Sequence, residues 1–377
     1  MKLLGIFIVF STLFLAIPGI ISYHSGAKKK GRTLLRLSLL ITIAYVIFNI
    51  FIIKEKVGDA SLYAKQFKII RASGLLTALR SSLQENGFIL ITWLISKVTS
   101  NYNIYRMILF FINLCLIWLA SKKIKIEPFY MIIISYLWYV FFLAYTMAAI
   151  RQGVSMCVFL YLLSGLVHEE RELNEAGHGY KHGRIKVFVF LLLMLSLHRS
   201  SILMVPGIII LYLSVIKKYG GKKLSLYLSF AAIIISIVML LWGNIENFFE
   251  KEYYSRMIEY STPEAKQRYG VKGIRFDFII FNTAPLLISG YLYLKKKRKF
   301  NILIASYIYA YLAFIPFSTI SHSDRIAAYT FIQIPLLLFS IISELKQKMI
   351  LQIIFISTFI STGFLRYWEI YLDVQGY

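Results

Sequence analysis

Apolar runs of about 20 residues recur along the whole chain, and short polar stretches separate them. A helix of that length crosses the hydrocarbon core of a bilayer and satisfies its own backbone hydrogen bonds there. Each run therefore predicts one spanning helix, and together they predict an all-α, polytopic integral membrane protein with about twelve transmembrane helices. The runs lie at 2–22, 34–53, 103–120, 129–146, 148–167, 185–198, 200–216, 223–242, 276–294, 300–319, 326–342 and 349–367.

One further apolar run, GFILITWLISKV at 87–98, is short and is followed by the polar sequence TSNYN. We predict that this segment is re-entrant or interfacial and does not cross the bilayer. A full crossing at this point would invert the orientation of every later helix.

Lysine and arginine cluster in short loops beside the apolar runs, and the positive-inside rule predicts that these loops face the cytoplasm. The outer loops are then 54–102 and 243–275, while the polar loop 168–186 is cytoplasmic. The basic clusters that set this orientation lie at 28–32, 122–125, 217–223, 295–299 and 346–348.

Each outer loop also contains a helical pattern in which apolar residues lie opposite basic ones. We expect both segments to form amphipathic helices on the outer membrane surface. The apolar positions are Tyr63, Phe67, Ile70 and Gly74 in the first loop, and Phe249, Tyr253 and Met257 in the second.

The composition favours one membrane-embedded domain over residues 1–377. Hydrophobic residues make up 58% of the chain and charged residues only 16%, whereas soluble domains carry about 25% charged residues. The net charge of +24 comes from basic residues beside apolar runs, which form no continuous basic face. This distribution argues against nucleic-acid binding.

The sequence predicts neither a metal site nor a cofactor. Its aspartates show no D-x-D spacing, which argues against a metal-dependent nucleotide-sugar transferase. His178 and His182 lie one helical turn apart, but they belong to the polar cytoplasmic loop and have no evident third ligand. The sequence GVKGIR lacks the lysine pattern of a phosphate-binding loop and follows no predicted strand.

A single arginine, Arg151, interrupts the apolar sequence AYTMAAIRQGVSM at 144–156. The predicted topology places it just inside the outer end of the helix at 148–167. Burying an arginine costs several kcal/mol unless a partner compensates its charge, which makes the residue a functional candidate. The start of a helix also offers free N–H groups and the positive end of the helix dipole. We therefore expect a phosphate as its partner.

Three other predicted outer tips carry arginine, so four arginines converge on one face of the membrane. A local alternative pairs Arg275 with Asp277. It also satisfies Arg325 through Asp324 or a phospholipid and makes His198 a helix cap. The residues of the three tips are His198 and Arg199, Arg275 and Asp277, and His322, Asp324 and Arg325.

Few side chains near the outer surface could take a proton from a hydroxyl group. Asp59, Glu85 and His198 are the candidates. Asp324 is a further one if Arg325 does not hold it. A carboxylate in a loop is more often simply solvated, so each assignment depends on its surroundings.

Four sequence motifs together resemble the EpsG family of bacterial polysaccharide proteins, a branch of the Wzy-type polymerases. The resemblance lies in the order of the motifs and in the many-helix topology. The cytoplasmic loop around 168–186 and the outer loop 243–275 show no matching pattern. The motifs are ENGFILITWLISKVTSNYNIY at 85–105, preceded by the loop of Asp59, then AAIRQGVSM with Arg151 and Gln152, LHRSSILMVP with His198, and SDRIAAY with Arg325.

The resemblance implies a GT-C-like glycosyltransferase at the outer face of the bacterial cytoplasmic membrane. Its substrates would be oligosaccharide repeat units on undecaprenyl pyrophosphate. The growing glycan would pass from its lipid carrier to the non-reducing end of the next lipid-linked unit. A flippase and a chain-length-regulating co-polymerase are the implied partners, besides the bilayer itself.

Within this reaction, the expected roles follow from the chemistry of the leaving group. Arg151 and Arg325, assisted by Arg199 or Arg275, would hold the pyrophosphate, because arginine stays charged and can bind phosphate oxygens through two N–H groups. The acceptor hydroxyl would be activated by His198, Asp59 or Glu85. Further substrate contacts are expected from Gln152, His322 and Asp324.

Three rival functions remain open from the sequence. A flippase or transporter of the same lipid-linked sugars would also need intramembrane arginines, but it would line a path through the bilayer with charge. An O-antigen ligase would share the donor and transfer it to lipid A core. A structural scaffold would leave the clustered outer arginines unexplained.

Overall fold

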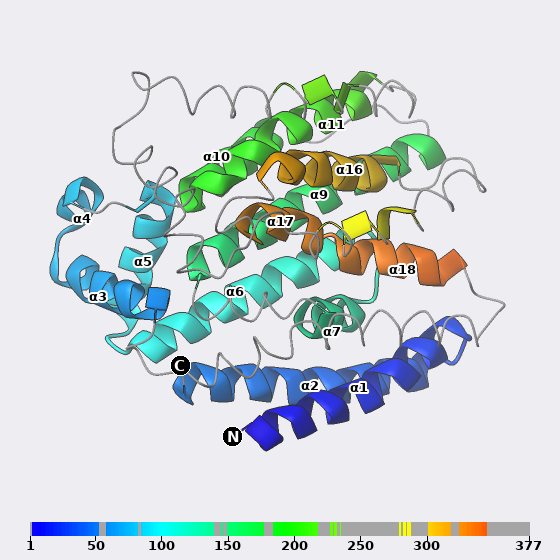
Figure 1. Ribbon diagram of the computed structural model, residues 1–377, viewed down its shortest axis with the longest axis horizontal. Helices are drawn as coiled ribbons and strands as arrows, with labels where there is room; N and C mark the ends of the chain where they lie inside the picture. The colour runs from blue at the N-terminus through cyan, green and yellow to red at the C-terminus, as the bar shows by residue number, and fades with distance from the viewer. Residues whose placement is uncertain are drawn as a thin grey trace. The chain divides into compact units, whose positions relative to one another are not determined.

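The computed structural model describes residues 2–52, 58–81, 84–138, 145, 149–176, 184–217, 301–317 and 324–344, together with isolated positions between 227 and 287. Within these ranges all regular structure is helical (Figure 1). The predicted all-α class is confirmed for this part of the chain.

The described helices begin and end as follows. They are α1 Lys2–His24, α2 Lys28–Ile52, α3 Gly58–Ala72, α4 Leu75–Ser81, α5 Asn86–Val98, α6 Tyr102–Lys123, α7 Pro128–Trp138, α9 Ile150–Ala176, α10 Arg184–Leu197, η1 Arg199–Met204, α11 Val205–Lys217, α16 Asn301–Phe314, η2 Ile315–Phe317, α17 Asp324–Phe331 and α18 Ile334–Glu344.

Four of the helical segments described here are long and apolar enough to cross a membrane, which confirms a membrane protein. They are Lys28–Phe51, Tyr102–Lys123, Ile150–Leu173 and Arg199–Ile216, and each coincides with a predicted span. The spans predicted at 223–242, 276–294 and 349–367 lie wholly or mostly outside the described residues. The number of about twelve spans and the GT-C-like architecture stay predictions.

The short run at 87–98 forms α5, a helix of 13 residues. At 1.5 Å per residue such a helix is about 20 Å long, less than the hydrocarbon thickness of about 30 Å. Its buried face packs against α3, α4, α6 and α10. This length agrees with the predicted re-entrant or interfacial segment, which itself stays a prediction.

The first outer amphipathic pattern forms α3, and its apolar face is covered by protein. Tyr63, Phe67 and Ile70 are all at most 5% exposed, and α3 packs against α5. Gly74 lies beyond the end of α3, between α3 and α4. The second pattern, around Phe249, lies outside the described residues.

The span predicted at 326–342 coincides with two helices, α17 and α18, and its crossing of the membrane stays a prediction. The chain forms α17 and α18 with a turn at Ile332 and Gln333 between them. Pro335 explains the break, because proline has no N–H group and its ring clashes with the carbonyl one turn earlier. The buried side chain of Gln333 donates from Nε2 to the carbonyl oxygen of Tyr329 at 2.7 Å, which satisfies one backbone group near the break.

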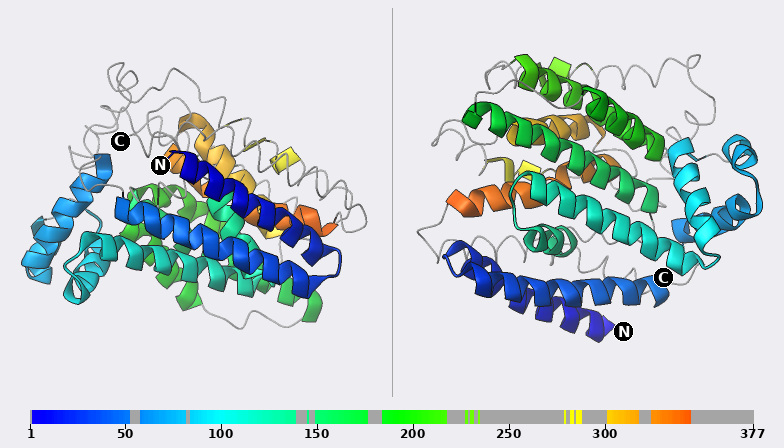
Figure 2. Two further views of the ribbon diagram at one scale, coloured as in Figure 1. Left: turned by 90° about the horizontal axis from the view of Figure 1, so that it is seen from below. Right: turned by 180° about the vertical axis from the view of Figure 1, so that it is seen from behind.

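The predicted single domain contains two compact units. The first comprises Met1–Ser164, Arg184–Arg199 and Leu338–Tyr377, and the second comprises Gly165–Gly183 and Ser200–Leu337. In the first unit α1 and α2 lie side by side (Figures 1 and 2), and α7 packs against both of them. In the second unit α16 packs on α11 and α17.

Close packing in the second unit depends on Gly207 of α11. A Cβ atom at this position would lie only 2.4 Å from the ring of Tyr309 on α16. The hydroxyl of Tyr309 donates to the carbonyl oxygen of Leu203 at 2.6 Å. The glycine therefore lets the tyrosine lie across the start of α11 and reach a carbonyl of the preceding turn.

Candidate functional site

Arg151 is the second residue of α9, so its side chain leaves the helix in the first turn. The chain before α9 is held close to this turn, because Gly153 has no side chain there. A Cβ atom on Gly153 would lie 2.7 Å from the carbonyl oxygen of Tyr145. The apolar sequence around Arg151 thus forms a tightly packed helix start that carries one permanent cation.

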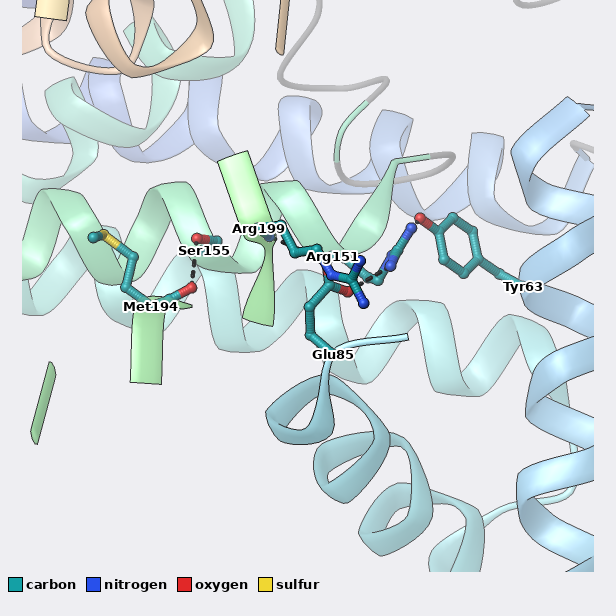
Figure 3. A network of polar contacts seen from close by, with 6 residues as sticks. All are labelled: Tyr63, Glu85, Arg151, Ser155, Met194 and Arg199. Atoms are coloured by element: carbon teal, nitrogen blue, oxygen red, sulfur yellow. Dashed lines mark hydrogen bonds and ion pairs between the residues drawn. The ribbon is translucent and has the colours of Figure 1, made fainter. Parts of the chain in front are cut away.

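Two side chains from distant segments hold the Arg151 guanidinium (Figure 3). Its Nη1 donates to Oε2 of Glu85 at 2.5 Å, and its Nε donates to the hydroxyl of Tyr63 at 2.8 Å. The guanidinium carbon also lies 5.3 Å from the centre of the Tyr63 ring, within the range of a cation–π contact. The side chains of Arg151 and Glu85 are only 18% and 9% exposed.

Glu85 occupies the N-cap position of α5, but its carboxylate makes no hydrogen bond to its own helix. The carboxylate points away from α5 instead, and its Oε1 accepts a hydrogen bond of 3.0 Å from the backbone N–H of Arg199. Both carboxylate oxygens are therefore engaged, one by a guanidinium and one by a backbone amide. Glu85 connects the starts of three helical segments, namely α5, α9 and η1.

The helix pair α9 and α10 brings Arg199 to this place. Ser155, one turn after Arg151, donates its hydroxyl to the carbonyl oxygen of Met194 at 3.2 Å (Figure 3). The same carbonyl accepts the N–H of His198 at 3.3 Å and so ends α10. His198 is 8% exposed, and the side chain of the following Arg199 is exposed.

The cluster of Glu85, Arg151 and Arg199 carries two positive charges and one negative charge. A guanidinium has five N–H groups, and in the described part of the chain two of those on Arg151 have acceptors. The positive ends of helix dipoles add to the excess of positive charge. The arrangement is chemically suited to an anion with several oxygen atoms, because the cluster carries an excess of positive charge.

A metal ion has no comparable place among the described residues. No three His, Cys, Asp or Glu side chains in those ranges come together to hold one.

Comparison of the sequence with known protein families identifies the family to which the chain belongs. The sequence profile of the EpsG family matches residues 38–376. The chain belongs to the EpsG family. No curated protein and no solved structure matches it. Membership of the EpsG family, together with the apolar helices, indicates a membrane protein with a polysaccharide polymerase-type function.

The EpsG family match covers every residue predicted for the site, and the structure brings three of them together. Glu85 contacts both Arg151 and Arg199, while buried His198 and Gln152 are the chain neighbours of Arg199 and Arg151. Asp59 lies one helical turn before Tyr63 on α3. Asp324 and Arg325 begin α17 in the second compact unit. Arg275, His322 and the outer loop 243–275 lie outside the described residues.

Sequence reasoning missed two residues of this region. Tyr63 is an apolar-face position in the helical pattern, yet its hydroxyl binds Arg151. Arg106, fully buried in α6, donates from Nη2 to the carbonyl oxygen of Ile50 at 2.5 Å and to Oδ1 of Asn103 at 2.6 Å. The available signal was an arginine one turn inside a predicted span, the same signal that identified Arg151.

Proposed function

We propose that this EpsG family protein transfers a growing glycan from undecaprenyl pyrophosphate to the non-reducing end of the next lipid-linked repeat unit. The reaction takes place at the outer face of the bacterial cytoplasmic membrane. The observation that supports it most directly is the guanidinium of Arg151, which Glu85 and Tyr63 hold at a helix start beside Arg199.

The leaving group explains why such a guanidinium is useful. The bond between the anomeric carbon and the phosphate oxygen breaks, and negative charge grows on the pyrophosphate as it leaves. A fixed cation aimed at that oxygen stabilises the transition state more than the ground state, which accelerates the reaction. Arg151 and Arg199 supply such cations in the first compact unit, and Arg325 supplies one at the start of α17.

Glu85 fits a positioning role better than the role of a proton acceptor. Its two oxygens already accept hydrogen bonds from Arg151 and from the backbone of Arg199. Its charge instead compensates one arginine and fixes the direction in which the guanidinium points.

The proton of the acceptor hydroxyl then goes to another group, and His198 is our assignment. It lies directly before Arg199, whose backbone N–H binds Glu85, and it is largely buried. Asp59, one turn before Tyr63, is the alternative base. Gln152, Arg275, His322 and Asp324 remain proposed substrate contacts, and the proposed reaction needs no metal ion and no cofactor.

Reconstitution tests the proposal directly. The purified protein in liposomes receives a synthetic undecaprenyl-pyrophosphate repeat unit, and the products are separated by size. We expect a ladder of longer glycans with the wild type and a rate at least about 100-fold lower with Arg151→Ala. Arg151→Lys keeps the charge but loses the planar guanidinium group that can donate two hydrogen bonds to one phosphate, so its polymerisation rate should also be strongly reduced.

Arg80→Ala is the matched control, because Arg80 is an exposed arginine in α4 of the same predicted outer loop. It should polymerise like the wild type. A correctly inserted Arg151→Lys protein at full rate would contradict the pyrophosphate role. Movement of the repeat unit across the bilayer without a ladder would instead identify a flippase, and transfer only to lipid A core would identify a ligase.

A further inference from the structure

Helices α5 and α10 pack closely against each other at Gly87 and Ser196. A Cβ atom on Gly87 would lie 2.1 Å from Oγ, 2.7 Å from Cβ and 2.9 Å from the carbonyl oxygen of Ser196. Carbon atoms in ordinary contact are about 3.5–4.0 Å apart. The hydroxyl could rotate away, but the Cβ atom and the carbonyl oxygen belong to the helix itself. Any side chain at position 87 would therefore push α5 and α10 apart.

This contact lies next to both ends of the Glu85 bridge. Glu85 is two residues before Gly87, and Arg199 is three residues after Ser196. The hydrogen bond from the Arg199 N–H to Oε1 of Glu85 measures 3.0 Å. Separating the helices by about 1 Å would lengthen this bond beyond the usual limit of a hydrogen bond. The helix crossing and the carboxylate position are thus mechanically linked.

The conformation of Glu85 supports the connection between the α5–α10 packing and the position of its carboxylate. An N-cap side chain normally bonds to N–H groups of the first turn of its own helix, but the carboxylate of Glu85 does not. Its position is set from outside α5, by Arg151 on α9 and by the residue that follows α10. The bond between Ser155 and Met194 fixes α9 and α10 to each other. The position of the Glu85 carboxylate then depends on how closely α5 packs against α10, and this distance depends on the absence of a side chain at Gly87.

We propose that Gly87 is a positioning residue, whose contact with Ser196 places the Glu85 carboxylate between Arg151 and the backbone of Arg199. The consequence for catalysis rests on the proposed function of Arg151. The placement of Glu85 does not, so the two can be tested separately. A glycine that merely allowed dense packing would affect stability without affecting the interaction of Glu85.

A double-mutant cycle on thermal unfolding in detergent separates these roles. Glu85→Gln removes the charge of the bridge and should lower the melting temperature of the wild type by several degrees. In a Gly87→Ala background the same change should have less than half of this effect, because the bridge is already broken. Adding Ser196→Gly to Gly87→Ala should restore part of the effect, since it removes the colliding Cβ and Oγ atoms while the carbonyl oxygen stays 2.9 Å from the added Cβ.

Two further variants keep the test decisive. Gly74→Ala is the control, because a Cβ atom at Gly74 would meet nothing within 4 Å, and the Glu85→Gln effect should stay at its wild-type size there. If Gly87→Ala does not insert into the membrane, Ser196→Thr adds one methyl group to the same contact and keeps the hydroxyl. It should weaken the Glu85→Gln effect in the same direction.

The glycan ladder provides the catalytic readout. Gly87→Ala should lower the polymerisation rate at least about 10-fold, and Ser196→Gly should partly rescue it. If the wild type makes no ladder, the proposed function fails, while the unfolding cycle still decides the role of Gly87. A full Glu85→Gln effect in the Gly87→Ala background overturns the positioning role whatever the ladder shows.

Discussion

The sequence predicted a phosphate as the partner of Arg151, but it did not predict which protein side chain compensates the charge. The need for a counter-charge follows from the cost of burying a guanidinium in an apolar run, and Glu85 is a candidate on independent grounds. Yet Glu85 lies 66 positions from Arg151. No local period connects two such positions, because their proximity depends on how α5 packs against α9 and α10. Residue types and single helices were predictable here, whereas the pairing required the packed structure.

Tyr63 offers the sharpest residue-level prediction. Its hydroxyl accepts a hydrogen bond from the charged Nε of Arg151, while its ring lies beside the guanidinium. Tyr63→Phe removes only the hydroxyl and should cost about 1.5–3 kcal/mol of stability, as expected for a hydrogen bond to a charged group. The polymerisation rate should also fall, but less than with Arg151→Ala, because Glu85 still holds the guanidinium.

The measurement compares thermal unfolding and ladder formation of Tyr63→Phe with those of Tyr161→Phe. The control removes a tyrosine hydroxyl elsewhere and keeps the ring on which Lys123 lies at 3.5 Å. A Tyr63→Phe protein that matches the control in both assays would show that the hydroxyl does not orient Arg151.

At the scale of helices, lengths and apolar faces were predictable and breaks were not. The runs at 34–53, 103–120 and 148–167 correspond to α2, α6 and α9 because apolar length alone defines a spanning helix. The run at 326–342 contains Pro335, and proline in an apolar helix can produce either a kink or a break. Hydropathy does not distinguish these outcomes, so the separation of α17 from α18 needed the structure.

Arg106 on α6 belongs to a chain of contacts that connects α2, α6 and α5, and its replacement should therefore lower the stability of the protein. It donates to the carbonyl of Ile50, one of the last four carbonyls of α2, which have no partner within their own helix. Its guanidinium carbon lies 5.1 Å from the centre of the Tyr102 ring, which stacks on Tyr105. Tyr105 in turn shares a hydrogen bond of 2.9 Å with Thr92 on α5. This chain of contacts runs from α2 through α6 to the helix that carries Glu85.

Arg106→Met should therefore destabilise the protein by about 2 kcal/mol, because it leaves a buried carbonyl at the end of α2 with one donor fewer. Arg106→Lys keeps the charge and one donor, and should recover part of the loss. Thermal unfolding in detergent measures both variants. Arg36→Met, at an exposed position of the same helix α2, is the control and should change stability by less than about 1 kcal/mol. Equal losses of stability in Arg36→Met and Arg106→Met would show that Arg106 does not hold these helices together.

At the scale of the molecule, two polar contacts in the first compact unit indicate whether the chain crosses the membrane an even or an odd number of times between α2 and α6. Arg106, near the start of α6, binds the carbonyl of Ile50 near the end of α2. Arg32, near the start of α2, forms an ion pair of 2.8 Å with Glu127, just after α6. The two helices therefore run antiparallel. The end of α2 and the start of α6 share one side, and the basic clusters at 28–32 and 122–125 share the other.

This geometry restricts the segment 53–101 to an even number of crossings, because it leaves and returns on the same side. If α5 crossed alone, the start of α6 would lie on the opposite side from the end of α2, so the contact between Arg106 and Ile50 agrees with the predicted re-entrant or interfacial α5. The charge pattern alone led to the same orientation, since both basic clusters belong to the cytoplasmic side under the positive-inside rule. Contact geometry and charge are independent arguments, and both agree with the predicted position of Glu85 and Arg151 at the outer side.

A reporter fused after residue 101 tests this orientation in living cells. We expect a periplasmic-type reporter to be active there and a cytoplasmic-type reporter to be silent, with the opposite result for fusions after residue 125. The fusion after residue 125 is the internal control, because it follows α6 and the lysines at 122–125. A cytoplasmic signal at residue 101 would mean that α5 crosses the membrane. It would move Arg151 to the cytoplasmic end of α9 and remove the proposed reaction from the outer face.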